Sequence, residues 1–366
     1  MKGEVHMRTI SLCLIVKNEQ STLCSCLESV REAVDEIVIV DTGSTDETKE
    51  IAGRYTERIF DFGWRDDFAA ARNYAFSKAT CDYILWLDAD DVLLEEDCRK
   101  LKELKLSIAE QVDAVSMIYH YAFDEFGNVT MSLRRNRLVK REKGFRWHGA
   151  VHEYLAVSGM VINSDIIVTH RRVHRHSDRN LMIFENRMRR GEPFSPRDLY
   201  YYGNELSDHQ MWEQAEKIYE RFLDTGEGWS EDIISSCMKL SDIGERLGKP
   251  QKQLAYLWKA MDYDEPRAEG CCRLGAYFLK RNRLREAAFW YRLAVRREKP
   301  KELWGFVHDA YWTWIPHLQL CIVYCGLEQY TRAFYHNEMA GRYRPDDSSV
   351  LHNRRYLEGV LRDEAL

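Results

Sequence analysis

The chain has 366 residues, enough for two domains of ordinary size. Apolar residues make up 45% of it, which suffices for a substantial core, and the net charge of -6 argues against a general nucleic-acid binder, because such proteins carry a basic surface. No apolar run reaches the roughly 18 residues that a membrane span needs, and residues 1–6 lack the apolar core of a signal peptide. None of the ten cysteines forms a Cys-x-x-Cys pair, so we expect a cytoplasmic protein with reduced thiols.

Strand and helix patterns alternate over the first hundred residues. β-rich runs at 9–16, 36–40, 58–62 and 83–87 are each followed by a helical pattern. This alternation predicts a mostly parallel sheet with helices on both faces. The carboxyl ends of such strands meet at one edge, which is where open α/β sheets bind their ligands.

Three carboxylates follow the apolar run 83–87 within four positions. Asp88, Asp90 and Asp91 would repel one another unless a cation lies among them, and a hard divalent cation prefers oxygen ligands. An isolated Asp-x-Asp is more often a turn that caps the next helix. Here the cation site is favoured, because polar residues also follow the earlier predicted strands, namely Asn18, Glu19 and residues 41–46.

Four blocks of the sequence resemble a known family. Residues 14–19, 38–46, 71–73 and 87–91 occur in the order seen in inverting family-2 glycosyltransferases of the GT-A fold, and the resemblance extends over residues 8–175. It implies a Rossmann-like mixed sheet that binds a sugar nucleotide, typically a UDP-sugar. It also implies a divalent metal cofactor, Mn²⁺ or Mg²⁺.

The resemblance assigns roles to the acidic residues of the donor site. Asp90 is the best candidate for a metal ligand, Asp88 is expected at the ribose or as a second metal ligand, and Asp91 is expected to support them. Asp41 resembles the carboxylate that reads uracil, whose imide N–H is a hydrogen-bond donor.

The remaining donor-site candidates are less specific. Arg72 resembles the family's nucleotide-side arginine, a planar cation suited to base or phosphate oxygens. Its alternative is a surface ion pair with Asp66 or Asp67. Asn18 and Glu19 could equally mark only the start of a helix. By resemblance, the nucleotide-sugar site also includes the following residues: Val16, Asn18, Glu19, Gly43 and Ala89.

Residues 144–155 predict the acceptor side of the site. They resemble the Val-His-Glu segment of family-2 enzymes that carry tetratricopeptide-like carboxyl-terminal regions. Inverting transfer needs one general base to take the acceptor's proton, and Glu153 is the candidate. Other family members have a Glu-Asp pair here, so the His-Glu pair leaves open whether His152 contributes.

A predicted strand at 166–170 ends in His170. Enzymes of the GT-A fold often supply a last metal ligand from such a distal position, so His170 is a candidate partner of Asp90. An ordinary histidine at a strand end is the alternative. The basic stretch that follows could order over a diphosphate as a lid or form a solvated face, and it contains Arg171, Arg172, Arg175 and Arg179.

The second half of the chain is helical and repetitive. Corresponding positions near Tyr202, Leu240, Leu274 and Leu320 are spaced close to the tetratricopeptide period, with insertions. We therefore expect a GT-A domain at residues 1–185 and an all-α, tetratricopeptide-like repeat domain at 186–366.

Stacked repeats present a concave surface to a peptide or to a second copy of the chain. Relatives with this architecture include enzymes that glycosylate Cys or Ser of bacteriocin precursor peptides. The leading hypothesis is thus a metal-dependent inverting transfer of a hexose from a UDP-sugar to a Cys or Ser/Thr side chain of a peptide or protein. One alternative is a glycan or small-molecule acceptor, with the repeats serving homodimerisation. Another is a repeat adaptor with an inactive nucleotide domain, which the intact Asp41, Asp88 and Asp90 disfavour.

Overall fold

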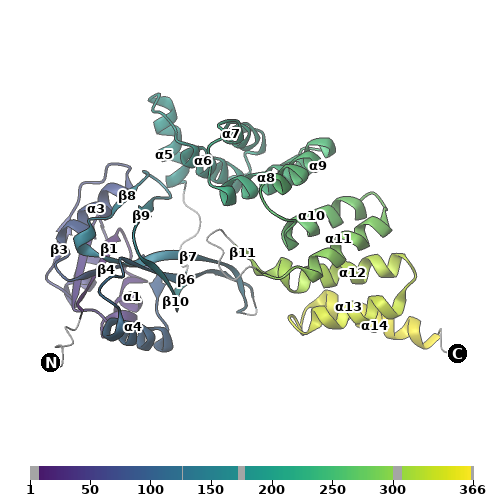
Figure 1. Ribbon diagram of the computed structural model, residues 1–366, viewed down its shortest axis with the longest axis horizontal. Helices are drawn as coiled ribbons and strands as arrows, with labels where there is room; N and C mark the ends of the chain where they lie inside the picture. The colour runs from purple at the N-terminus through teal and green to yellow at the C-terminus, as the bar shows by residue number, and fades with distance from the viewer. Residues whose placement is uncertain (1–7, 126, 172–177, 300–306, 364–366) are drawn as a thin grey trace. The chain divides into compact units, whose positions relative to one another are not determined.

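The computed structural model describes residues 8–125, 127–171, 178–299 and 307–363. It divides into two compact units: Met1–Ala122 with Ser132–Phe194, and Phe123–Met131 with Ser195–Leu366 (Figure 1). The first unit is α/β and the second is helical. The predicted fold class, a mixed-sheet domain followed by a helical region, is therefore confirmed.

The sheet of the first unit is mixed. Its strands lie in the order β3-β2-β1-β4-β7-β6-β10-β5. β1 is parallel to β2 and β4, and β2 is parallel to β3, whereas β4–β7 and β10–β5 are antiparallel. The strands are β1 (Ile10–Val16), β2 (Glu36–Asp41), β3 (Ile59–Asp61), β4 (Tyr83–Trp86), β5 (Asp91–Val92), β6 (Ala114–Phe123), β7 (Val129–Lys140) and β10 (Val161–His170).

The central strands are apolar throughout because both of their faces are covered. Leu12 of β1 and Leu85 of β4 belong to one hydrophobic cluster, while their neighbours Cys13 and Trp86 belong to the other. α1 (Leu23–Val30), α2 (Thr48–Gly53) and α4 (Glu95–Ser107) contribute to the first cluster. α3 (Phe68–Lys78) and the two-stranded sheet β8 (Arg146–His148)–β9 (Tyr154–Ala156) contribute to the second (Figure 1).

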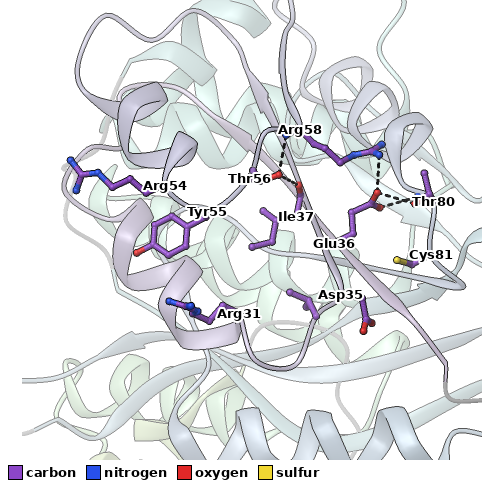
Figure 2. Close-up of a pocket in the computed structure, with 11 residues that line it drawn as sticks. Arg31, Asp35, Glu36, Ile37, Arg54, Tyr55, Thr56, Arg58, Thr80 and Cys81 are labelled. Atoms are coloured by element: carbon purple, nitrogen blue, oxygen red, sulfur yellow. Dashed lines mark hydrogen bonds and ion pairs between the residues drawn. The ribbon is translucent and has the colours of Figure 1, made fainter.

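A surface hollow of about 580 Å³ lies at the edge of the sheet where β2 begins (Figure 2). Its carboxylates already have cationic partners: Glu36 pairs with Arg58 at 3.1 Å, and Asp35 pairs with Lys105 at 2.7 Å. This hollow therefore presents few free acceptor groups. It also lies at the amino-terminal ends of the strands, opposite the edge that the sequence predicts for the ligand.

The second unit consists mainly of antiparallel helix pairs. In the described part of the chain, none of the helices is both long and apolar enough to cross a membrane. The short strand β11 (Val307–His308) pairs with β7, whose residues 129–131 belong to the same unit. α5 (Arg179–Arg189) belongs to the first unit. The helices of the second are α6 (Pro196–Asp208), α7 (Trp212–Asp224), α8 (Ser230–Arg246), α9 (Pro250–Lys259), α10 (Ala268–Leu279), α11 (Leu284–Arg296), α12 (Trp314–Gly326), α13 (Tyr330–Gly341) and α14 (Ser348–Asp363).

In two helix pairs a tyrosine ring of the second helix packs against a glycine of the first. A Cβ placed on Gly203 of α6 would lie 2.6 Å from the Tyr219 ring of α7, and one on Gly275 of α10 would lie 2.7 Å from the Tyr291 ring of α11. Both tyrosines are buried. The glycine is therefore required because the tyrosine ring packs directly on the helix backbone.

We predict that Gly203→Ala and Gly275→Ala each destabilise the protein. The added methyl group overlaps a buried ring, and such overpacking costs about 1–3 kcal/mol. Thermal unfolding followed by circular dichroism should show a midpoint lowered by several degrees for each variant.

Gly359→Ala in α14 is the matched control, because a Cβ there meets no atom within 4 Å. It should leave the midpoint unchanged or raise it, since alanine is the better helix former by about 1 kcal/mol. Equal midpoints for all three variants would contradict the packing described for the glycine–tyrosine pairs.

Candidate functional site

The carboxyl ends of β1, β2 and β4 form one edge of the sheet. The register pairs Val16 with Asp41 and Cys13 with Trp86, so the loops that follow the three strands lie next to one another. The Val16 carbonyl accepts hydrogen bonds from the backbone and the hydroxyl of Thr42. Val16 thus contributes to this edge through its backbone.

Asp41 is 2% exposed and ends β2. Its Oδ2 accepts hydrogen bonds from the backbone N–H groups of Gly43 and Ser44, both at 3.0 Å. Gly43 has a φ of +102°, a conformation that favours glycine. The other oxygen of Asp41, Oδ1, is buried and has no partner among the described residues. The loop therefore orients Asp41 and leaves one acceptor free.

Asn18 and Glu19 brace the neighbouring loops. The Asn18 Oδ1 accepts from the Thr45 N–H at 2.8 Å, and the Asn18 N–H donates to the Ser44 hydroxyl at 2.9 Å. The Glu19 carbonyl accepts from the N–H of Leu23, the first residue of α1. Asn18 therefore fixes the loop after β2, and Glu19 supports the start of α1.

Arg72 of α3 joins two carboxylates. Its Nη2 donates to Asp88 Oδ1 at 2.6 Å and its Nε donates to Glu153 Oε1 at 2.5 Å. The Arg72 side chain is 8% exposed, and its guanidinium group lies over the rings of Trp86 and Trp147, with its carbon 4.9 and 4.8 Å from their centroids. Stacking on aromatic faces suits a delocalised cation.

The alternative partners of Arg72 have other functions. Asp67 caps α3 by accepting from the Ala70 N–H at 2.9 Å, and Asp66 accepts from the Trp64 indole N–H at 2.9 Å. Burial by itself would raise the pKa of Asp88, but Arg72 and then Arg137 outweigh it and hold that pKa well below its usual range. Asp88 is therefore ionised and is engaged by Arg72.

The structure brings Asp90, Asp91 and His170 together. One ligand atom from each lies within 4.8 Å of the others. The antiparallel pairing of β10 with β5 places His170 opposite Asp91, and the His170 Nδ1 lies 3.4 Å from Asp90 Oδ1 and 3.5 Å from Asp91 Oδ1. The third member of this group is Asp91; the roles expected for Asp88, at the ribose or as a second metal ligand, stay predictions.

This group fits a hard divalent cation. Asp91 Oδ1 and His170 Nδ1 are buried and have no hydrogen-bond partner in the described structure, and such buried polar atoms require a compensating partner. Carboxylates are ligands that Mn²⁺ and Mg²⁺ prefer, and a neutral imidazole nitrogen is a common protein ligand for metal ions in general.

The surroundings of His170 hold its ring in place. The Tyr121 ring stacks on it at 5.3 Å with an interplanar angle of 2°, and Tyr119 packs edge-on at 5.8 Å. Burial would lower the pKa of His170, but Asp90 and Asp91 raise it to about 9. The two carboxylates therefore attract a positive charge at this position, which a proton or a metal ion can supply.

Asn73 positions the segment that carries Glu153. Its side-chain amide donates to the Trp147 carbonyl at 3.0 Å and accepts from the Trp147 N–H at 2.9 Å. This pair of bonds ties β8 to α3, so that the following loop brings Glu153 to Arg72. His152 precedes Glu153 with a φ of +50°, and His148 stacks on Tyr154.

The remaining predicted residues make few contacts that bear on the site. Ala89 is buried in the core beneath the acidic loop. The Arg171 N–H donates to the Asp90 carbonyl at 2.7 Å. Arg172 and Arg175, the middle of the predicted lid, lie outside the described residues.

The sequence analysis missed Arg137 of β7. It is 0% exposed and its Nη1 lies 3.0 Å from Asp91 Oδ2, which is also 0% exposed. The local signal was an arginine directly before the apolar pair Leu138–Val139. Nothing in that pattern identified Asp91 as its partner.

The amino-terminal region matches a known family. Residues 11–169 match the model described as glycosyl transferase family 2. A TPR repeat-containing protein of Synechococcus elongatus is 38% identical over 147 residues, which are 40% of this chain and 35% of that protein. The SPbeta prophage-derived glycosyltransferase SunS of Bacillus subtilis is 26% identical over 217 residues, 54% of this chain and 49% of SunS. The chain thus spans half or less of the length of these relatives.

A solved structure with a similar fold is glucosyl-3-phosphoglycerate synthase from Mycobacterium tuberculosis, in complex with Mn²⁺ and UDP-glucose. The similarity has a TM-score of 0.34 at 18% identity, and it covers 52% of this chain and 81% of the synthase. The family match covers every strand end described above except that of His170, which immediately follows it. Residues 11–169 of this chain thus match glycosyl transferase family 2, and a unit of repeated helix pairs follows them.

Proposed function

We propose that the protein is a metal-dependent inverting glycosyltransferase that moves a hexose from a UDP-sugar to a Cys or Ser/Thr side chain of a peptide or protein. The observation that supports it most is the convergence at one sheet edge of Asp90, Asp91 and His170 with the unpartnered oxygen of Asp41. The match of residues 11–169 to glycosyl transferase family 2 supports the reaction class.

On the donor side, each group meets one part of the sugar nucleotide. Asp41 Oδ1 accepts the imide N–H of uracil. Asp88 accepts from the ribose hydroxyls while Arg72 keeps it ionised. Asp90, Asp91 and His170 hold the divalent cation. When bound, this cation neutralises the charge that develops on the departing nucleoside diphosphate.

The charges of the site support a bound cation. Four carboxylates, on Asp88, Asp90, Asp91 and Glu153, lie with the guanidinium groups of Arg72 and Arg137, and the charge of Arg135 also acts on Asp88. The carboxylates outnumber these cations, and an additional positive charge is favoured because buried charges require pairing.

On the acceptor side, Glu153 is the general base. Its side chain is 11% exposed, and Oε1 is held by Arg72. Its second oxygen, Oε2, has no hydrogen-bond partner among the described residues and takes the proton of the attacking thiol or hydroxyl. The helical unit supports a polypeptide acceptor, because stacked helix pairs offer an extended surface for a peptide.

The metal requirement is tested with the full chain, UDP-glucose or UDP-N-acetylglucosamine, and candidate acceptor peptides. We expect turnover, measured as released UDP, to be lost with EDTA and restored by Mn²⁺ or Mg²⁺. Asp90→Asn should lower turnover by about 100-fold or more, because it removes charge stabilisation from the leaving group. Asp165→Asn is the control, since this aspartate is exposed and pairs with Lys100. If the Asp90→Asn variant turned over as fast as the unaltered protein, the assignment of Asp90 as a metal ligand would be wrong.

The uracil contact is tested with Asp41→Asn. Asp41 accepts on both oxygens: one serves Gly43 and Ser44, and the other serves the base. An amide has only one acceptor oxygen, so either the loop or the base must face an N–H group. UDP binding measured by calorimetry should weaken by about 10-fold or more, and the preference for UDP over CDP should narrow. An unchanged preference would mean that another group reads the base.

The general base is tested with Glu153→Gln. The variant should retain Mn²⁺ and UDP binding while transfer to the acceptor falls by about 100- to 10,000-fold. Mass spectrometry of the peptide gives the transfer readout, and it also identifies the modified side chain. Loss of UDP binding in the same proportion as transfer would indicate that Glu153 acts on the donor through Arg72 instead.

A further inference from the structure

Arg137 carries a positive charge that is fully buried in the protein. Its side chain is 0% exposed, and its guanidinium carbon lies 3.9 Å from the Trp86 ring centroid and 4.5 Å from that of Tyr119. Nη1 lies 3.0 Å from Asp91 Oδ2 and 3.4 Å from the Trp86 carbonyl. Burying a charge is unfavourable unless it is paired, so Asp91 is the counterion that allows an arginine at this position.

The pairing is incomplete on both sides. Nε and Nη2 of Arg137 are buried and have no hydrogen-bond partner in the described structure, and Asp91 Oδ1 has none either, its nearest polar neighbour being His170 Nδ1 at 3.5 Å. An ion pair retained only for stability would be expected to satisfy these atoms, because a buried pair with unsatisfied groups is less stable than an apolar core. The incomplete pairing therefore points to a use of the free Asp91 oxygen.

The two oxygens of Asp91 have different surroundings. Oδ2 faces Arg137 Nη1 and also accepts from the Asp88 N–H at 3.0 Å. Oδ1 lies 3.5 Å from His170 Nδ1, inside the group that Asp90 completes. The carboxylate is thus fixed in one orientation, with one oxygen engaged and the other facing the metal ligands.

We propose that Arg137 is a positioning residue for the metal, which holds Oδ2 of Asp91 so that Oδ1 alone is presented as a ligand. This inference rests on the proposed function, since it takes the group of Asp90, Asp91 and His170 to bind a divalent cation. A carboxylate limited to one oxygen suits the six-coordinate geometry of Mg²⁺ and Mn²⁺. It disfavours Ca²⁺, which takes more oxygens and often binds a carboxylate with both. Arg137 therefore contributes to the choice of ion.

The test is a titration of the full chain with Mn²⁺ alone, followed by electron paramagnetic resonance of the free ion, and a competing titration with Ca²⁺. Arg137→Lys keeps the charge and removes the planar fork that faces Asp91. We expect its Kd for Mn²⁺ to rise by about 10- to 100-fold, the usual effect of losing a group that orients a metal ligand. We also expect the preference for Mn²⁺ over Ca²⁺ to narrow.

A double-mutant comparison separates positioning from a general loss of structure. In an Asp91→Asn background, adding Arg137→Lys should change the Kd for Mn²⁺ by no more than about 2-fold, because the residue through which Arg137 acts is already altered. Arg134→Gln is the matched control. This arginine lies on the same strand and bonds to Ser116 and Ser164 instead, so its loss should leave Mn²⁺ affinity unchanged.

The outcomes distinguish this inference from the function on which it rests. No Mn²⁺ binding by the unaltered protein would overturn the metal assignment itself. Mn²⁺ binding that Arg137→Lys leaves unchanged, or that it weakens equally with and without Asp91, would overturn the positioning role alone. Should Arg137→Lys fail to fold by circular dichroism, the unaltered protein decides: equal affinity for Ca²⁺ and Mn²⁺ contradicts a single-oxygen ligand.

Discussion

The ion pairs of Arg72 hold the candidate site together. The guanidinium group joins Asp88, at the end of β4, to Glu153, which follows β8. Without this cation the two carboxylates would lie close together beside Trp86 and Trp147 and would repel each other. The next residue, Asn73, ties β8 to the same helix. One turn of α3 therefore sets the distance between the proposed donor and acceptor sides.

A second arginine, Arg137, gives the aspartates of the acidic loop different partners. Asp88 is engaged by Arg72, Asp91 by Arg137, and Asp90 by neither of them. Each guanidinium lies against the Trp86 ring, whose two neighbours thus fix two different carboxylates. Three aspartates within four positions would repel one another if they were left equivalent. Their distinct partners remove that repulsion and leave the atoms beside His170 for a cation.

In the helical unit, the sequence pattern predicts how the helices pack but not what they bind. Its helix pairs follow from small residues and aromatics at regular spacing, and the tyrosine rings over Gly203 and Gly275 give the physical reason for that spacing. The same pattern carries no information about an acceptor, because it reports how helices pack and not what their exposed faces bind. The peptide acceptor therefore stays a proposal that rests on architecture.

The sequence by itself determined the mixed sheet, the helical repeats and the edge at which Asp41, Asp88 and Asp90 lie. Alternating burial and strand–turn order are local properties, and the carboxyl ends of parallel strands must share an edge. Only the tertiary structure decided which polar atoms remain free there. Arg137 lies 46 positions from Asp91, Glu153 lies 81 from Arg72, and the β10–β5 register sets His170 against Asp91. Such pairings depend on strand register and on long-range packing, which no local pattern encodes. The group formed by Asp90, Asp91 and His170 therefore became visible only in the folded molecule.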